Sequence, residues 1–492
     1  MIFDNTMKFI CRLLSVIIIP ALLVACDEEA GFSVNPSLRL SFSRDTITFD
    51  TIFTTVGSPT AGLLVHNYNR ESLRIRNVML GSGGQSGFNV LVDGQYGTNI
   101  NDIEVRAKDS IFVYASVRLE SNGADVPLQV KDSLLFTLES GVQQKVMLLA
   151  YGRDVTFLRA ENVAADRTIG KGHYVIYDSL TVAPGATLTL AEGATLYFHD
   201  RAFLKVEGRL VAAGSKERPI IMRGDRTDNM FSYLPYDRVP GQWGGVVFAS
   251  TSNENVLSHC DIHSARYGVR VEQGDTAAQR ITIELSKLYN FDGNALELNM
   301  AHATVSNSLI ANAQGNCVKV VGGDVSFVHC TIANFYVWKE RDVALALYNN
   351  ADGEPAPLRR ALFANCMITG SRSDEVMGYL TDLGDTIPGG SNYRFENSFV
   401  NTVAEGDTCF VDVTFDVQES SSFAAGNFKL IDHETFNYDF HLTGESLARG
   451  RASESYLEAL PYDLDGVPRE AGAVDAGCYQ FVEPAEECKE YR

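Results

Sequence analysis

The sequence predicts an all-β protein built from two domains, a β-sandwich followed by a solenoid of short stacked strands. Three observations support this prediction. The 492 residues are 45% hydrophobic and 21% charged, which is typical of a folded protein and excludes a disordered or fibrous one. Residues 27 to about 152 contain around seven short strand-like segments separated by turn residues. From about residue 165, a pattern of apolar and small residues recurs roughly every 22 residues, and such periods are typical of solenoids.

The N-terminal segment 1–25 is expected to be an export signal. Lys8 and Arg12 supply positive charge, and residues 13–24 form an apolar run that is too short to span a membrane. The sequence Leu23-Val24-Ala25-Cys26 then resembles the lipobox of bacterial lipoproteins. This resemblance implies cleavage before Cys26 and attachment of lipid to that cysteine. The alternative is an ordinary signal peptide that is cut nearby.

An acidic stretch, Asp27-Glu28-Glu29, follows the expected anchor directly. It resembles the signal with which certain Gram-negative lineages send lipoproteins to the cell surface. In other lineages, an aspartate at this position implies retention in the inner membrane. We therefore expect a lipid-anchored protein of the outer membrane that lies at the cell surface.

The first domain, residues 26–152, is predicted to be a β-sandwich because its strands are short and regularly spaced. Three of its segments, residues 48–52, 65–67 and 108–111, read TFDTI, VHN and KDSI. Their order resembles that of the immunoglobulin-like domains of the abnormal-spindle and hydin type. The resemblance implies an immunoglobulin-like β-sandwich that acts as a spacer or a protein-binding unit.

The second domain is periodic. Residues 183–190 and 191–198 share the pattern Ala-x-Gly-Ala-Thr-Leu, in which each glycine marks a turn and each Thr-Leu begins a strand. Further on, an apolar anchor residue recurs, and each repeat has the length of three short strands and their turns. The anchors are Ile262, Leu288, Ile310 and Ile332, followed after longer insertions by Ile368 and Val400.

Two columns of residues flank these anchors. Strand alternation turns the residue two positions before each anchor inward, and this position always holds a small residue. Because the cysteines of this column align with serines, we predict that they are buried, reduced thiols. Two positions after the anchor, Asn290, Asn312 and Asn334 follow Ser264 in consecutive repeats, where asparagine tolerates a left-handed turn and stacked amides can bond to one another. The small-residue column is Cys260, Ser286, Ser308, Cys330, Cys366 and Ser398.

With these columns, residues 165–480 resemble a right-handed parallel β-helix of the pectate-lyase-like fold. Residues 463–469 and 474–480 resemble the closing segment of many exported bacterial β-helix proteins, although Cys478 and Gln480 depart from the usual motif. We expect this segment to cap the last coil. A calcium site at Asp463 and Asp465 is the less favoured alternative, since calcium takes six to eight oxygen ligands.

Candidate catalytic residues are few. Arg270, Glu297 and Lys319 align on successive strands, which favours a solvated ion-pair ladder over an acid–base pair. The strongest polar cluster is residues 259–263, in which His259, Asp261 and His263 are expected to face outward on one strand. These three residues are the candidates for catalysis or metal binding, and a solvated turn edge is the favoured alternative. We expect no metal and no cofactor.

The candidate binding residues are aromatic. Two insertions, residues 335–360 and 371–394, interrupt the repeat most strongly and contain Tyr336, Trp338 and Tyr379. Their rings can stack on sugars or on a protein partner. Packing against the flank of the helix is the alternative. Tyr289, near a turn, is a further aromatic candidate of the same kind.

A formal charge of −21 excludes nucleic acid as a partner and disfavours acidic polymers. The sequence therefore favours a membrane-anchored, non-catalytic binding or adhesion-type scaffold for a glycan or a surface protein. The alternative function is that of a polysaccharide lyase or glycoside hydrolase that acts on an extracellular glycan.

Overall fold

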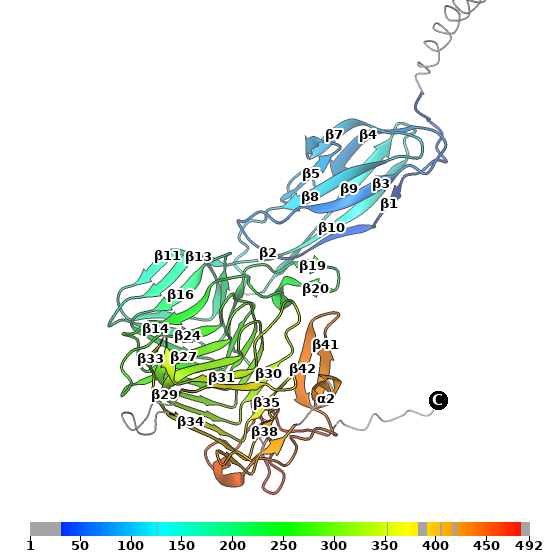
Figure 1. Cartoon of the computed structure of the whole chain (residues 1–492). Helices are drawn as coiled ribbons and strands as arrows, with labels where there is room; N and C mark the ends of the chain where they lie inside the picture. The colour runs from blue at the N-terminus through cyan, green and yellow to red at the C-terminus, as the bar shows by residue number, and fades with distance from the viewer. Residues whose placement is uncertain are drawn as a thin grey trace, which may run out of the picture. The chain divides into compact units, whose positions relative to one another are not determined.

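The computed structural model describes residues 31–124, 126–351, 353–381, 391–403, 406–416 and 421–483. The expected signal segment, the anchor Cys26 and the acidic stretch after it lie outside the described residues. The chain divides into two compact units between Asp154 and Val155, and both consist of β-strands (Figure 1). Within the described part of the chain, no helix is long and apolar enough to cross a membrane.

The first unit is a sandwich of two five-stranded sheets. In order across the first sheet lie β1 (Ser41–Phe42), β3 (Ala61–His66), β8 (Ser110–Val117), β5 (Phe88–Val92) and β6 (Gln95–Gly97). In order across the second lie β2 (Thr46–Phe53), β10 (Gln143–Arg153), β9 (Leu128–Leu138), β4 (Leu73–Leu80) and β7 (Asn99–Val105).

Alternating burial along the strands of the sandwich explains its core. In β8, for example, Val113 and Ala115 are buried between the sheets, whereas Phe112 and Tyr114 point outward and are exposed. All strand pairs are antiparallel except β2 with β10, which are parallel. The structure therefore agrees with the predicted β-sandwich.

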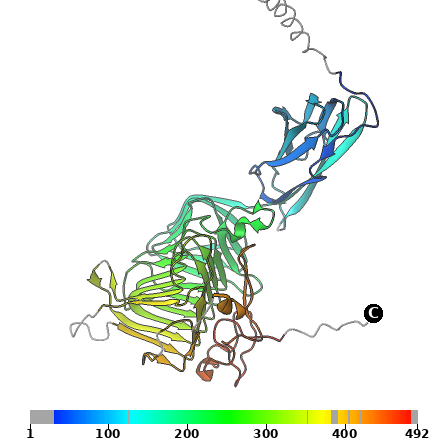
Figure 2. The same ribbon diagram turned by 45° about the vertical axis from the view of Figure 1, so that its right-hand side comes forward.

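The second unit is a parallel β-helix whose coils stack in register into three ladders of strands (Figures 1 and 2). Its parallel pairing begins with β11 (Thr156–Val163) and β13 (Gly172–Val182). The first ladder contains β12 (Arg167–Ile169), β14 (Thr187–Ala191), β17 (Arg209–Ala213), β22 (Asn255–Ser258), β25 (Gln279–Glu284), the second halves of β27 (Leu296–Ser306) and β29 (Val318–Val328), β34 (Leu358–Ala364), β37 (Ser391–Glu396) and β39 (Phe410–Val411).

The second ladder positions the site described below. It contains β15 (Ala194–Phe198), β18 (Ile220–Gly224), β23 (Cys260–His263), β26 (Lys287–Phe291), β28 (Leu309–Ala313), β30 (Thr331–Asn334), β35 (Met367–Gly370), β38 (Phe399–Val400) and β40 (Thr414–Phe415). The third ladder contains β16 (Phe203–Val206), β21 (Gly245–Phe248), β24 (Val269–Val271), the first halves of β27 and β29, β31 (Leu345–Tyr348) and β36 (Val376–Tyr379).

The predicted small-residue column lies inside the helix and bonds one coil to the next. The backbone N–H of Cys260 donates to Ser286 Oγ at 3.0 Å, and that of Cys366 donates to Ser398 Oγ at 2.9 Å. Cys260, Cys330 and Cys366 are free and buried, which confirms the predicted thiols. Burial raises the pKa of the Cys260 thiol, so it stays protonated.

The polar column two positions after each anchor forms a corner of the helix. Ser264, Asn290 and Asn312 have φ angles of 61°, 62° and 54°, so the predicted left-handed turns are confirmed. The amides, however, bond to the backbone rather than to one another at the two positions where their bonds are clearest. The N–H of Phe335 donates to Asn312 Oδ1 at 3.0 Å, and Asn334 Nδ2 donates to the Ala313 carbonyl at 2.9 Å.

Short hairpins and helices lie outside the three ladders. The hairpin β19 (Asn229–Phe231) and β20 (Leu234–Pro235) leads into the 3-10 helix η1 (Tyr236–Arg238), and β32 (Asn350–Ala351) pairs with β33 (Glu354–Pro355). After the last coil come α2 (Ser421–Gly426), the hairpin β41 (Phe428–Asp432) and β42 (Asn437–Leu442), and the 3-10 helix η3 (Glu454–Tyr456). Figure 1 shows β41, β42 and α2 beside the coils.

The expectation that the closing segment caps the last coil is wrong. The segment lies instead along the outer face of three earlier coils, where Arg469 Nη2 donates to Asn307 Oδ1, the Cys478 N–H donates to Thr331 Oγ1, and the Gly477 N–H donates to the Asn365 carbonyl. The physical reason is that the later strands of the second ladder carry apolar side chains on their outer face. The C-terminal residues bury these side chains from solvent. These side chains, Leu309, Ala311, Ala333, Met367 and Phe399, form a core with Phe428, Phe440, Leu464 and Tyr479.

Candidate functional site

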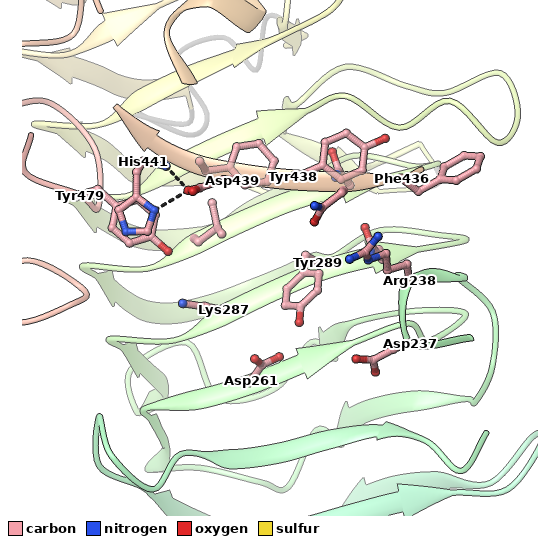
Figure 3. A pocket seen from close by; sticks show the side chains of 15 residues that line it. Asp237, Arg238, Asp261, Lys287, Tyr289, Phe436, Tyr438, Asp439, His441 and Tyr479 are labelled. Carbon is pink, nitrogen blue, oxygen red and sulfur yellow. Dashed lines mark hydrogen bonds and ion pairs between the residues drawn. The ribbon is translucent and has the colours of Figure 1, made fainter. Parts of the chain in front are cut away.

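A cleft of about 330 Å³ lies where this C-terminal cover ends and the outer face of the second ladder becomes open. Its floor is formed by β23, β26 and β28, one wall by η1, and the roof by the hairpin β41–β42 (Figure 3). The volume falls in the range of small-ligand sites, ~300–1,000 Å³. The lining residues come from four regions of the sequence and include Asp237, Arg238, Asp261, Lys287, Tyr289, Asn290, Asn312, Phe436, Asn437, Tyr438, Asp439, His441 and Tyr479.

His263 joins the wall of the cleft to its floor. Its Nδ1 lies 2.7 Å from Asp261 Oδ1, and its Nε2 lies 2.7 Å from Asp237 Oδ1. Arg223 Nη1 lies 2.8 Å from the same Asp237 oxygen, and the ring of Tyr289 is stacked on the imidazole at 4.9 Å. The imidazole is buried, with its side chain only 4% exposed, so the cluster holds η1 rigidly against the coil.

The charges of this cluster stabilise one another. Burial alone would lower the pKa of His263, but the charge and hydrogen bonds of Asp261 and Asp237 outweigh it and raise this pKa to about 9. Burial alone would raise the pKa of Asp237, but the hydrogen bond and charge of His263 and the charge of Arg223 lower it to about 2. At neutral pH, a cationic imidazole therefore lies between two carboxylates.

A second cluster of the same kind lies at the roof of the cleft. His441 on β42 contacts Asp439 through Nδ1 and lies 2.8 Å from Asp465 Oδ2 through Nε2. The hydrogen bond that His441 donates to Asp465 is the largest effect on His441 and raises its pKa, while the pKa values of Asp439 and Asp465 are lowered. The ring of Tyr479 lies 4.0 Å from the imidazole. Figure 3 shows Lys287 and Tyr289 between this cluster and Asp261.

Aromatic rings of the hairpin complete the roof. Phe436, Tyr438 and Phe440 line the cleft, and Trp338 from the first insertion stacks on Phe436 at 4.2 Å. Arg238 Nη1 donates to the Thr435 carbonyl at 3.1 Å and so connects the wall to the roof. The site therefore combines aromatic rings, carboxylates and the amides of three asparagines.

The sequence-based picture of residues 259–263 needs correction. His259 is not on the strand with Asp261 and His263 but precedes it, at a corner where its φ is 49°. His263 is buried rather than solvated, because η1 folds over it and supplies Asp237. Asp261 lines the cleft as an outward residue. Both nitrogens of His263 are occupied by carboxylates, and no group of metal-ligating side chains is found among the residues that the structure describes.

The ion-pair ladder on the third ladder is present. Glu297 Oε1 lies 3.5 Å from Arg270 Nη2 and 3.9 Å from Lys319 Nζ, and the three residues are neighbours in register. The ladder is less solvated than expected, however, because the side chain of Glu297 is only 8% exposed. Asn294 Nδ2 donates to its other oxygen at 3.0 Å, which compensates for the burial.

The candidate binding aromatics lie apart from one another. Tyr336 is buried, and its hydroxyl donates to Asp292 Oδ1 at 2.9 Å, so its ring has no open face for a ligand. Trp338 supports the cleft through Phe436 without lining it. Tyr379 is exposed and stacks on Tyr348 of the neighbouring coil at 4.5 Å. Tyr289 lines the cleft directly.

Sequence reasoning missed the wall and the roof. Asp237 and Arg238 lie in a loop without repeat signature. The hairpin β41–β42 falls within residues 165–480, for which the sequence predicts regular coils. A signal was present, since residues 436–441 read FNYDFH, an alternation of aromatic and polar residues typical of a strand with one aromatic face.

No protein-family model matches the chain, and no curated protein matches its sequence. Among solved structures, a family 123 glycoside hydrolase from Clostridium perfringens aligns with 25% of this chain at 8% identity and a TM-score of 0.18, and this chain covers only 30% of that protein. The ASH/PapD-like domain 7 of human CEP192 aligns with 26% of this chain and 96% of its own, at 10% identity and a TM-score of 0.18.

A GH87 α-1,3-glucanase catalytic unit from Streptomyces thermodiastaticus aligns with 73% of this chain and 89% of its own, at 9% identity and a TM-score of 0.18. At these TM-scores, the similarities identify neither the family nor the function of this chain.

Proposed function

We propose that this protein is a glycan-binding protein and that the cleft between the second ladder and the hairpin β41–β42 holds the sugar. The observation that carries the proposal is the composition of the cleft. Tyr289, Phe436 and Tyr438 offer aromatic surface for the apolar faces of sugar rings, and Asp261 and Asn437 offer acceptors and donors for hydroxyl groups. A concave site with this combination suits a small, uncharged, hydroxyl-rich ligand.

The ionised state of three carboxyl groups around the cleft favours binding over hydrolysis. A glycoside hydrolase of the usual kind needs one carboxylic acid whose pKa is raised, so that it can protonate the leaving group. Here the pKa values of Asp237, Asp439 and Asp465 are all lowered by their histidine partners. These groups are therefore suited to accept hydrogen bonds from sugar hydroxyls, not to act as general acids.

A glycan panel with the soluble protein, residues 27–492, tests the proposal. We expect wild-type binding to at least one neutral oligosaccharide, measured by calorimetry, and a loss of about tenfold or more in affinity for Tyr438→Ala and for Asn437→Ala. Tyr267→Ala is the matched control, because Tyr267 is 52% exposed and does not line the cleft. Absence of binding across the panel, or equal affinity of the cleft variants, would contradict the proposal. Appearance of new reducing ends would instead favour an enzyme.

The proposal includes the location of the protein. Cys26 would carry the lipid that anchors the chain to the outer membrane, residues 27–29 would direct it to the cell surface, and the sandwich would act as a spacer between the anchor and the β-helix. The lipobox-like sequence 23–26 and the apolar run before it support this location. An anchored chain of this kind would hold a glycan-binding site at the cell surface.

A further inference from the structure

Within its strands, one face of the sandwich has no charged residue; the exposed Arg118 directly follows β8 at the edge of this face. The outward positions of the first sheet, which we call the uncharged face, are Ser41, Gly62, Leu64, His66, Asn89, Leu91, Tyr96, Ser110, Phe112, Tyr114 and Ser116. Asp, Glu, Lys and Arg make up 21% of the chain, yet none of them stands at these positions. The outer face of the second sheet, in contrast, carries Arg74, Glu104, Lys131 and Lys145.

Aromatic rings lie across the middle of the uncharged face. Gly62, Tyr114, Leu91 and Tyr96 are cross-strand neighbours and form one row over four strands. Phe112 is next to Tyr114 on the same side of β8, with ring centroids 5.8 Å apart and ring planes parallel to within 9°. Phe112 is 56% exposed and Tyr96 is 69% exposed. The result is a row of aromatic side chains that are exposed to solvent.

Protection of the sheet explains only part of this surface. The ring of Tyr114 lies over Gly62, where an added Cβ would be 3.5 Å from the ring, and aromatic cover of a glycine stabilises a sheet. Phe112 and Tyr96 cover no glycine and expose more than half of their surface. Contiguous exposed apolar patches on soluble proteins typically mark interaction sites.

We infer that the uncharged face binds a neutral polysaccharide, which lies flat across the rings of Phe112, Tyr114 and Tyr96. Sugar rings stack on aromatic faces through their apolar C–H groups. His66, Asn89 and Ser116 at the borders supply donors and acceptors for hydroxyl groups. This site is independent of the cleft, since it belongs to the other unit of the chain.

Charge decides between this ligand and other partners. A face without charge gains nothing from an acidic polymer, and the net charge of −21 repels one. A second copy of the chain would bring the same net charge and the same repulsion. A neutral, extended polymer meets neither obstacle, and a flat face without walls suits a polymer surface better than a short soluble sugar.

The experiment is a depletion assay of the soluble protein, residues 27–492, on insoluble cellulose, β-1,3-glucan and α-1,3-glucan. Wild-type protein is expected to bind at least one of them equally at 0.05 and 0.5 M NaCl, because no ion pair contributes. The affinity of the double variant Phe112→Ser/Tyr96→Ser for the polymer is expected to be lower by about tenfold or more. Because both side chains are exposed, its thermal unfolding is expected to match that of the wild type.

Two controls separate this site from others. Tyr151→Ser removes a tyrosine from the outer face of the second sheet, where its hydroxyl accepts from Gln129, and should bind like the wild type. Tyr438→Ala in the cleft should also keep its binding to the insoluble polymer. If the double variant is unstable, Phe112→Lys serves in its place. It puts a charge on the same face and should likewise lower the affinity for the insoluble polymer by about tenfold or more.

The inference is overturned if the wild type binds none of the three polymers, if the face variants bind as well as the wild type, or if 0.5 M NaCl abolishes binding. It is also overturned if sedimentation equilibrium shows a dimer that the double variant dissociates, since the occupant would then be a second copy. Loss of binding in Tyr438→Ala with full binding in the double variant would assign the polymer to the cleft alone.

Discussion

His263 is expected to stabilise the β-helix in a pH-dependent way. Its pKa in the folded protein is raised to about 9, against 6.5 for a free histidine. A raised histidine pKa means that the stabilisation is complete below pH 6.5 and is lost as the pH rises through about 9. The shift corresponds to about 3 kcal/mol at ~1.4 kcal/mol per pKa unit, and the burial of the imidazole keeps solvent from screening it.

The variant His263→Gln tests this magnitude. At pH 6, the variant should unfold with a free energy lower than that of the wild type by about 3 kcal/mol or more, since it also leaves Asp261 and Asp237 without a cation. By pH 10 the wild-type imidazole is neutral, so the difference should shrink by about 3 kcal/mol. Groups that do not contact this cluster titrate alike in both proteins and cancel in the difference, and the pKa of Asp237, a carboxyl partner of His263, is about 2 in the wild type, well below pH 6.

Tryptophan fluorescence in urea provides the assay. Both tryptophans of the chain, Trp243 and Trp338, lie in the β-helix, so their signal reports on this unit alone. Trp243 is also a close reporter, because its Nε1 donates to the His263 carbonyl at 2.8 Å. His199→Gln is the control, since His199 also contacts a carboxylate, Asp225, but is 52% exposed and should contribute no more than about 1 kcal/mol. A wild-type-minus-variant difference that stays constant from pH 6 to pH 10 would refute the reasoning.

Three further predictions concern other parts of the chain. Cys26→Ser should release the protein from the membrane fraction, because acyl chains stabilise by ~0.8 kcal/mol per buried CH₂, and persistent membrane association would speak against the lipid anchor. Cys260→Ser should fold with a modest loss of stability, whereas Cys260→Leu should overpack the column and lose about 1–3 kcal/mol in urea unfolding; equal stability of the two would contradict the packing. Trp338→Ala should remove the ring that supports Phe436, which lowers stability by roughly 0.5–1.5 kcal/mol and weakens glycan binding in calorimetry; unchanged affinity would show that the roof holds without it.

The regular part of the β-helix is readable from the sequence because every coil repeats the same environment. The position of Cys260 is surrounded in the same way as that of Ser286, so small residues recur there, and the left-handed corners at Asn290 and Asn312 recur for the same reason. The same packing and backbone requirements in each coil therefore select the same residue types at the same spacing. The fold class and the reduced thiols follow from this repetition.

The cleft leaves no such signal because it forms once. Asp237, Asp261 and Tyr438 come from three distant segments, and only the fold of η1 and the hairpin over the second ladder brings them together. His263 illustrates the difficulty. Alternation along β23 correctly places Asp261 outward, but the burial of His263 depends on a loop whose path the local sequence does not determine.

The closing segment has a consequence for how the β-helix comes apart. In a solenoid, each coil contacts only its neighbours, so coils open one at a time from an end. Here Arg469, Cys478 and Gly477 of the closing segment bond to Asn307, Thr331 and Asn365, which belong to three successive coils. Opening one of these coils therefore also requires the closing segment to detach from it. Their amide hydrogens are therefore expected to exchange with solvent as one cooperative block, while coils nearer β12 are expected to open separately.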